Sequence, residues 1–530
     1  MNRRQFLSTA AAIPGLSLAA PRLASAQTAA RVLKFVPSSD LTTLDPMFTT
    51  GFVTRNHALM VYDTLYGADE NQRAQPQMAE GHTIGDDGKT WRITLREGLR
   101  FHDGEPVRAR DVVQSLKRWA SRDPYGMTLM ERTEELLAES DRVVVFRLKK
   151  PFPHLADVLG KPTPYLPAIM PERLAKTSGS TQISEIVGSG PYQFVPEERT
   201  SGALAVYRRF EGYVPRPNGK TSFMAGPKVA HFDRVEWHTM PDAGTAASAL
   251  QMGEIDWWEH PSPDLLPLLE RNRNLKSEIL QADGSMGVMR FNHLQPPFNN
   301  PELRRALLAG IVQSDYMISV AGDDTKKWRD GVGFFQPDSA MASKDGLEAL
   351  TGPRSNAAVK KALEKAGYNG ERVVMLSAAD SSLTFPLNEV GAAYLRDVGI
   401  NLDYQTQDWG SVWQRLQSRE SIDKGGWNIH CNYTAGLSAM NPAAFSYLRG
   451  NGAGALFGWP SSPAIEGLRD QWLDSGNLAE QQRICRDIQL KAFEELPFIP
   501  LGVFYQGTAY RKDLVDMQKG LPLFYGVRRV

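Results

Sequence analysis

The spacing of hydrophobic and polar residues divides this chain into two parts with different expected secondary structure. Before about residue 286, apolar and polar positions mostly alternate, which predicts short strands with a few helices inserted among them. The expected strands are 31–36, 91–95, 143–148 and 204–208, and the expected helices are 56–65, 246–252 and one that starts at 109. This part of the chain is therefore predicted to be strand-rich.

After about residue 286, the pattern predicts strands and helices in alternation. Asn300 can cap the helix that follows it, and Pro301 occupies the first turn of that helix. The expected strands are 287–291, 373–378 and 400–404, and the expected helices are 300–311, 357–366, 388–397 and 481–494. Residues 498–530 return to strands and turns, so the second part is predicted to be an α/β unit.

The first 26 residues have the composition of an export signal. Arg3 and Arg4 precede a mildly apolar stretch, 6–20, which a Pro-Gly pair makes too broken to span a bilayer. Ala24-Ser25-Ala26 then supplies the small residues that a signal peptidase requires. We predict a twin-arginine signal peptide over 1–26, with an ordinary Sec signal as the alternative.

Composition and charge restrict the class of protein further. Hydrophobic residues make up 42% and charged residues 23%, and the formal net charge is zero. There is no basic excess, so we expect no nucleic-acid partner. No cysteine lies near the predicted cleavage site, and no later apolar run is long enough to span a membrane. We predict an exported, soluble periplasmic protein without a lipid anchor, in which Cys431 and Cys485 either form one disulfide or stay free.

A search for catalytic and metal-binding patterns finds none. The nine histidines are dispersed, and there is no CxxC, HExxH, GxSxG, GxGxxG or P-loop pattern. His102-Asp103 lies on a glycine turn before the helix at 109, where the histidine is expected to order the turn. Arg108 stands at the expected cap position of that helix, so we expect a poorly capped start. We predict that the chain is not an enzyme and holds no metal or cofactor.

Aromatic residues in the second half are the better candidates for ligand contact. Flat amphipathic side chains offer a large contact area at a low entropic cost, although most tryptophans in a chain of this size pack in the core. The residues that we predict to contact a ligand are Trp257, Trp258, Trp409, Trp427, Tyr433 and Asn441.

Several motifs, taken in order, resemble the solute-binding proteins of ABC transporters in the dipeptide, oligopeptide and nickel-binding family (family 5). The most specific is Leu95–Gly104 (LREGLRFHDG) followed by Ala109–Val113. Gly188–Tyr192 (GSGPY) is similar to the family's GTGPY, with serine in place of threonine. The other matching segments are 44–46, 62–65, 76–80, 91–95, 253–256, 297–306, 366–368, 398–400 and 497–501. The resemblance covers nearly the whole chain after the signal.

This resemblance implies an α/β, two-lobe periplasmic-binding-protein fold (type II, cluster C like) with a hinge and an extra peripheral subdomain in lobe I. Lobe I would comprise 27–65, 188–285 and 503–530, the peripheral subdomain 66–187, and lobe II 286–502. Gly188, Gly190 and Pro191 are expected to supply unusual backbone angles between them. The resemblance also implies a monomer that captures a small organic or peptide-like solute and delivers it to an ABC permease and ATPase complex at the inner membrane.

One departure from the family concerns the ligand. Peptide-binding relatives place an aspartate after a Gly-Trp, where it pairs with the α-ammonium of the peptide, but here no carboxylate occurs between Asp423 and Glu466. A buried ammonium without a charge partner would be costly. We therefore expect a neutral or anionic organic solute, or a modified peptide. The alternatives are a nickel chelate, an opine, an oligosaccharide, a secreted hydrolase on this scaffold, or a sensory or chaperone-like binding module.

Overall fold

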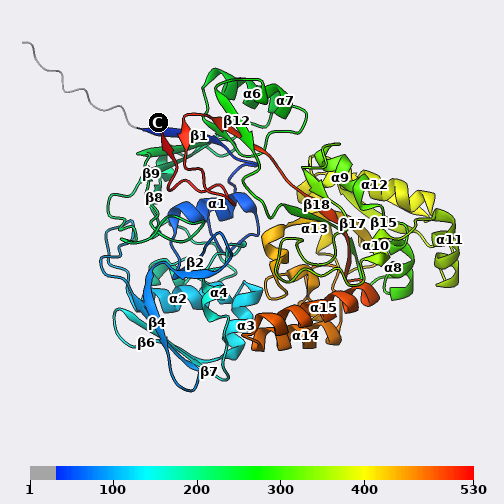
Figure 1. Ribbon diagram of the computed structural model, residues 1–530, viewed down its shortest axis with the longest axis horizontal. Helices are drawn as coiled ribbons and strands as arrows, with labels where there is room; N and C mark the ends of the chain where they lie inside the picture. Colours follow the sequence, from blue (N-terminus) through cyan, green and yellow to red (C-terminus); the bar gives the residue numbers. More distant parts are fainter. Residues whose placement is uncertain (1–30) are drawn as a thin grey trace, which may run out of the picture.

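The computed structural model describes residues 31–530, which form two lobes built on separate sheets (Figure 1). The predicted signal peptide lies outside the described residues. The lobe I sheet has seven strands, with β1 next to two parallel neighbours, β10 and β11. In spatial order they are β12 (Leu275–Glu278), β19 (Thr508–Arg511), β11 (Trp257–Trp258), β1 (Val32–Val36), β10 (Arg234–His238), β9 (Leu204–Arg209) and β8 (Tyr192–Phe194).

The lobe II sheet has six strands, and its central strand β13 pairs antiparallel with both β17 and β18. All seven residues of β13 are buried, because both faces of the sheet are covered. In spatial order the strands are β14 (Trp328–Arg329), β18 (Phe498–Phe504), β13 (Ser285–Phe291), β17 (Ile429–Ala435), β15 (Val373–Ala378) and β16 (Leu402–Gln407). Its helices are α8 (Pro301–Leu308), α9 (Gln313–Ala321), α10 (Glu348–Thr351), α11 (Asn356–Lys365), α12 (Thr384–Asp397), α13 (Trp409–Leu416), α14 (Pro463–Asp474) and α15 (Leu478–Glu495).

The chain crosses between the two sheets twice, which is the arrangement that permits rigid-body closure. One connection joins β12 to β13 and the other joins β18 to β19. Both run side by side across the top of the gap between the lobes in Figure 1. Because each connection is short, the two lobes can rotate about them without changing their own strand pairing.

A peripheral subdomain with its own four-stranded sheet lies below lobe I in Figure 1 and reaches toward lobe II. Its strands, in order, are β4 (Ala79–Ile84), β5 (Thr90–Leu95), β7 (Val143–Leu148) and β6 (Thr133–Ala138), and its helices are α2 (Ala109–Ala120), α3 (Pro124–Arg132), α4 (Leu155–Leu159) and α5 (Glu172–Ala175). The remaining elements are α1 (Phe52–Val61), β2 (Tyr66–Ala68), β3 (Ala74–Pro76), α6 (Ala243–Met252), α7 (Leu266–Glu270), β20 (Leu514–Val515) and β21 (Arg528–Arg529).

The start of α2 lacks a side-chain cap from Arg108, as the sequence predicts, and Asp111 compensates in part. The Asp111 carboxylate accepts a hydrogen bond from the backbone N–H of Arg108 at 2.8 Å. Its other oxygen accepts from the backbone N–H of Glu172, also at 2.8 Å. Asp111 thus satisfies the N–H of the cap residue itself, whereas Arg108 offers no side-chain acceptor to the N–H groups of the first turn, as a serine or threonine would have done.

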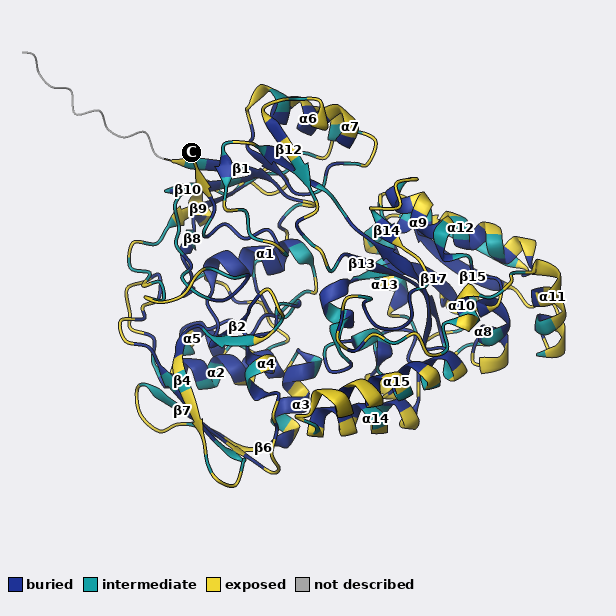
Figure 2. Cartoon of the chain, viewed as in Figure 1, coloured by how far each residue is buried: buried dark blue, intermediate teal, exposed yellow. Residues whose placement is uncertain are grey.

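Helix α1 begins and ends four residues earlier than predicted. The prediction placed a helix at 56–65, whereas α1 spans Phe52–Val61 and the chain is extended again at Tyr62. The hydrophobic pattern misplaces it because α1 is buried on nearly every side, with Arg55, Asn56 and His57 as enclosed as its apolar residues. Figure 2 shows α1 in the buried colour along nearly all of its length, except at the end that begins with Phe52.

Gly188 and Gly190 are required for a different reason than the one predicted. Neither has a φ in the left-handed region. Instead they pack against the end of α1, where a Cβ on Gly188 would lie 1.9 Å from the Val61 carbonyl oxygen. A Cβ on Gly190 would lie 2.5 Å from the Met60 carbonyl oxygen. The GSGPY motif therefore marks a close approach of two backbones.

His102, at the best-matching motif, fastens the peripheral subdomain to this glycine segment. Its Nδ1 accepts from the Gly188 N–H at 3.2 Å, and its Nε2 lies 3.0 Å from the Gly190 carbonyl oxygen, to which it donates. Both bonds are satisfied by the neutral ring. The structure thus gives His102 an ordering role, as predicted, with no contact to reactive groups.

Protonation of His102 should destabilise the fold in a defined pH window. Burial lowers the pKa of His102 to about 4, below its unfolded value of about 6.5. The unfolded chain therefore takes up the proton first, so the stability contributed by the neutral ring is complete above pH 6.5 and is lost as pH falls toward 4. Within that window we expect His102→Gln to remove a slope of roughly 1.4 kcal/mol per pH unit from the urea-derived unfolding free energy. Equal slopes in the two proteins would contradict this role.

Two further sequence questions are answered in the described part of the chain. Cys431 and Cys485 are both buried free thiols, with no disulfide between them. Burial raises the pKa of each thiol. None of the helices over 31–530 is long and apolar enough to cross a membrane.

Candidate ligand-binding site

The two lobes meet at an aromatic contact beside the hinge. The rings of Phe52, at the start of α1, and Tyr433, near the end of β17, lie 6.3 Å apart between centroids. Tyr433 also packs on Phe504 of β18, at 5.8 Å. The Arg55 guanidinium lies 4.9 Å from the Phe52 ring centroid. Of the residues predicted to contact a ligand, Tyr433 is the one that the structure places between the lobes.

On the lobe I side, a network of buried, hydrogen-bonded polar and charged side chains lies next to this contact. Arg55 donates from Nε and Nη2 to the Asn56 side-chain oxygen, at 3.2 and 3.0 Å. Asn56 in turn donates to Glu259 at 2.9 Å, and the other Glu259 oxygen accepts from the Ser38 N–H at 2.7 Å. Burial lowers the pKa of Arg55 to about 10, an effect that the nearby charges of Glu259 and Asp283 oppose. Nη1 of Arg55 has no hydrogen-bond partner among the described residues.

Asp283 brings a second carboxylate to the junction between the lobes. It precedes β13 and accepts from the backbone N–H of Leu437, at 2.9 Å, just beyond the end of β17. Burial raises the pKa of this carboxyl. The absence of carboxylates between Asp423 and Glu466 therefore does not leave the interlobe surface without acids, since Glu259 and Asp283 reach it from other segments.

On the lobe II side, one charged residue stands on the central strand. Arg290 of β13 is 3% exposed and is enclosed by two aromatic rings. The centroids of Tyr447 and Phe457 lie 4.5 and 4.7 Å from its guanidinium carbon. Its Nη2 donates to the Phe457 carbonyl oxygen, whereas Nη1 has no partner in the described chain.

Tyr447 connects this residue to the contact between the lobes. Asn432 donates to the Tyr447 hydroxyl at 3.5 Å. The pKa of Tyr433 is raised to about 12, first by burial and then by Tyr447 and Glu259. These aromatic and charged side chains come from both lobes. This set, here called the interlobe site, consists of Phe52, Arg55, Glu259, Tyr433, Tyr447 and Arg290.

The predicted tryptophans lie mainly in the cores. Trp427 is fully buried, and its indole N–H donates to the Leu416 carbonyl at 3.1 Å, so it packs within lobe II. Trp257 and Trp258 are buried on β11 of lobe I, where the Trp257 indole donates to the Thr508 hydroxyl at 2.7 Å. All three residues therefore pack within the lobes, and their contact with a ligand stays a prediction.

Trp409 and Asn441 have intermediate positions. Trp409, half-buried at the start of α13, lies 6.4 Å from the ring of His430, which is the strand neighbour of Arg290. Asn441 accepts from the backbone N–H groups of Ala443 and Ala444, at 3.0 and 3.2 Å, and so orders its own turn. Trp409 therefore stays a candidate near the interlobe site, whereas the side-chain oxygen of Asn441 has a structural task.

Sequence reasoning missed the charged members of the site. Arg290 had a usable signal, because it is the one charge in an otherwise apolar predicted strand, 287–291. Arg55 and Glu259 had none, because they come together only through the packing of α1 against the end of β11.

The family model for bacterial extracellular solute-binding proteins, family 5 (middle), matches residues 73–454. A probable peptide ABC transporter periplasmic-binding protein of Sinorhizobium fredii is 35% identical over 534 residues, 99% of each chain. The chain belongs to family 5 of the bacterial extracellular solute-binding proteins.

Other family 5 solute-binding proteins are similar over nearly the same length. The glutathione-binding protein GsiB of Escherichia coli (strain K12) is 26% identical over 516 residues, 94% of each chain. The structure of the binding protein AgaA from A. tumefaciens R10, in complex with agropinic acid, superposes with a TM-score of 0.78 at 19% identity, covering 94% of this chain and 99% of that one. The predicted family and two-lobe fold are confirmed, and the twin-arginine signal stays a prediction.

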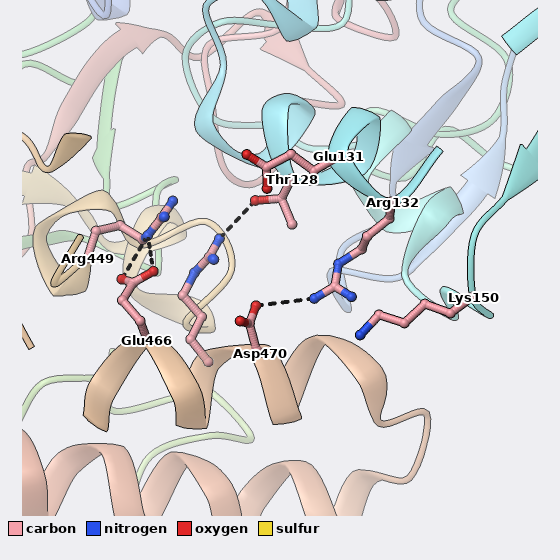
Figure 3. A pocket seen from close by; sticks show the side chains of 8 residues that line it. Thr128, Glu131, Arg132, Lys150, Arg449, Glu466 and Asp470 are labelled. Carbon is pink, nitrogen blue, oxygen red and sulfur yellow. Dashed lines mark hydrogen bonds and ion pairs between the residues drawn. The ribbon is translucent and has the colours of Figure 1, made fainter. Parts of the chain in front are cut away.

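In this solute-binding protein the peripheral subdomain also touches lobe II, around a charged pocket of about 310 Å³ (Figure 3). Arg132 of α3 pairs with Asp474 and Asp470 of α14, at 2.7 and 3.3 Å, and Lys150 pairs with Asp474 at 2.7 Å. Beside these pairs, the rings of His154 and Trp472 stack with centroids 4.4 Å apart. The two lobes are therefore held together at a second place, away from the hinge.

These ion pairs should favour the closed form of the solute-binding protein. Both acids are exposed to solvent, and a pair at a surface is worth about 0.2–1 kcal/mol, so replacing both acids (D470N/D474N) should lower the ratio of closed to open molecules about tenfold. Förster transfer between dyes on cysteines introduced at the exposed positions Glu134 and Ala479 would report the distance across the interface.

The matched control is E480Q/D487N, which removes two acids that pair with Arg483 inside lobe II. Raising the salt concentration should open the native protein and the control, and should change D470N/D474N little. An unchanged closed fraction in D470N/D474N would show that these pairs do not contribute to closure.

Proposed function

We propose that this chain reversibly captures a small peptide-like or other organic solute between its lobes and delivers it to an ABC permease and ATPase complex at the inner membrane. It does so as an exported, non-enzymatic monomer in the periplasm. The observation that carries the proposal is the interlobe site, which is assembled from both lobes next to two chain crossings. A ligand that contacts Tyr433 and Arg55 together is bound only when the lobes approach, so binding and closure are coupled.

We further propose that the solute is neutral or anionic, or is a modified peptide. Arg55 lies near the carboxylates of Glu259 and Asp283, whereas no acid of the described chain pairs with Arg290, so the lobe II part of the site carries an unpaired positive charge. The aromatic rings of Phe52, Tyr433 and Tyr447 offer flat apolar contact around these charges. Within residues 31–530, no three His, Cys, Asp or Glu side chains gather as they would around a metal ion, and the proposal needs none.

Native mass spectrometry of the protein as purified, followed by calorimetric titration, tests both proposals. The probes are glutathione, the ligand for which the relative GsiB is named, together with N-acetylated and unmodified tripeptides of zero net charge. We expect a retained solute or micromolar binding of an anionic or N-blocked probe. Tight binding of the unmodified neutral tripeptides would overturn the ligand class and leave solute capture standing. Turnover of any probe would overturn the non-enzymatic function.

A further inference from the structure

Arg290 is a buried cation whose hydrogen bonding within the protein is incomplete. It is 3% exposed, donates through Nη2 to the Phe457 carbonyl, and lies close enough to the Tyr447 hydroxyl to interact with it, but its Nη1 has no hydrogen-bond partner in the described chain. No carboxylate of residues 31–530 forms an ion pair with it. A buried charge with an unmade hydrogen bond costs free energy, so its retention inside a strand calls for a compensating group.

His430 lies next to Arg290 and has a ring nitrogen that accepts no hydrogen bond from the described residues. The two residues are direct partners in the register of β13 and β17. His430 Nδ1 lies 2.9 Å from the Leu376 carbonyl oxygen. A carbonyl can only accept, so Nδ1 carries the proton and Nε2 of the neutral ring is an acceptor. That Nε2 is fully buried and also has no partner in the described chain.

Aromatic rings fix the geometry of this pair. Tyr447 and Phe457 enclose the guanidinium, and Trp413 packs on Phe457 with centroids 5.0 Å apart. Trp409 lies beside His430, at 6.4 Å. A planar guanidinium held in this way presents its free N–H in one direction, which favours a planar acceptor such as a carboxylate.

We propose that Arg290 and His430 form a recognition centre for a carboxylate with a hydrogen-bond donor next to it. The solute carboxylate accepts from Arg290 Nη1, and a neighbouring hydroxyl or amide group of the solute donates to His430 Nε2. This inference rests on the proposed function and assigns an orientation to the solute, with its carboxylate end in lobe II.

Small carboxylates test the centre without knowledge of the natural solute. The probes are propionate and lactate, which differ by a hydroxyl next to the carboxylate, with chloride at equal ionic strength as reference. Both acids should raise the thermal unfolding temperature of the full-length protein above its value in chloride, lactate more than propionate. Arg290→Met should weaken both about 100-fold, Arg290→Lys should weaken them less, and His430→Phe should abolish the advantage of lactate.

Arg372→Met is the matched control, because Arg372 is an exposed lobe II arginine paired with Asp423 and Asp403. It should respond like the native protein. The inference is wrong if carboxylates stabilise the native protein no more than chloride does, or if Arg290→Lys and His430→Phe respond like the native protein. A natural solute that still co-purifies with Arg290→Met would overturn this centre while leaving solute capture intact, whereas the absence of any bound solute or probe would count against capture itself.

Discussion

Replacing Arg118 by methionine is expected to lower the free energy of unfolding by about 3–5 kcal/mol. Arg118 of α2 and Asp45 form a bidentate pair, at 3.1 and 2.7 Å, and both side chains are 1% exposed. Asp45 also accepts from the Ile183 N–H at 3.0 Å, so the pair joins three distant segments. Without Arg118 the buried carboxylate is left uncompensated. Urea unfolding, followed by circular dichroism, measures the loss.

A double-mutant cycle separates the charge from the packing. Asp45→Asn combined with Arg118→Met removes both charges, so it should be more stable than Arg118→Met alone. Breaking the exposed pair of Arg483 and Glu480 should cost less than about 1 kcal/mol and serves as the control. Additive losses in the cycle would show that the pair contributes no coupling.

Replacing Trp427 by alanine should lower the unfolding free energy by a similar amount, about 3–5 kcal/mol, because a fully buried indole leaves a large cavity. Its neighbours in the same apolar cluster, among them Val374, Leu376 and Leu416, are strand and helix residues of lobe II that cannot collapse freely into the space. The same urea measurement applies.

The milder change Trp427→Phe distinguishes a core residue from a ligand contact. It should cost stability but leave the affinity for whichever probe the native protein binds within about twofold. Tyr433→Ala provides the comparison, because Tyr433 lies between the lobes and its removal should weaken that affinity. A large loss of affinity in Trp427→Phe, with normal closure of the two lobes, would show that Trp427 contacts the ligand.

Much of the local structure was predictable because it depends on neighbouring residues. The Asn300 cap, with Asn300 accepting from the Glu302 N–H at 2.9 Å, and the left-handed Gly253 that closes α6 are encoded within a few positions. Helix α1 was displaced in the prediction because an element enclosed on all sides carries no amphipathic period. The aromatic residues were poor guides to the site for a related reason, since a tryptophan in a core and one in a cleft look alike in sequence.

The sequence by itself determined the family, the two-lobe fold and the solute-binding function, since these follow from motifs whose order and spacing persist along the chain. Only the tertiary structure decided which residues form the candidate site. Arg55 and Glu259 lie about two hundred positions apart in the chain, joined through the bond from Asn56 to Glu259. Arg290 and His430 meet through the register of two strands. Such pairings arise from long-range packing, which produces no local periodic pattern in the sequence.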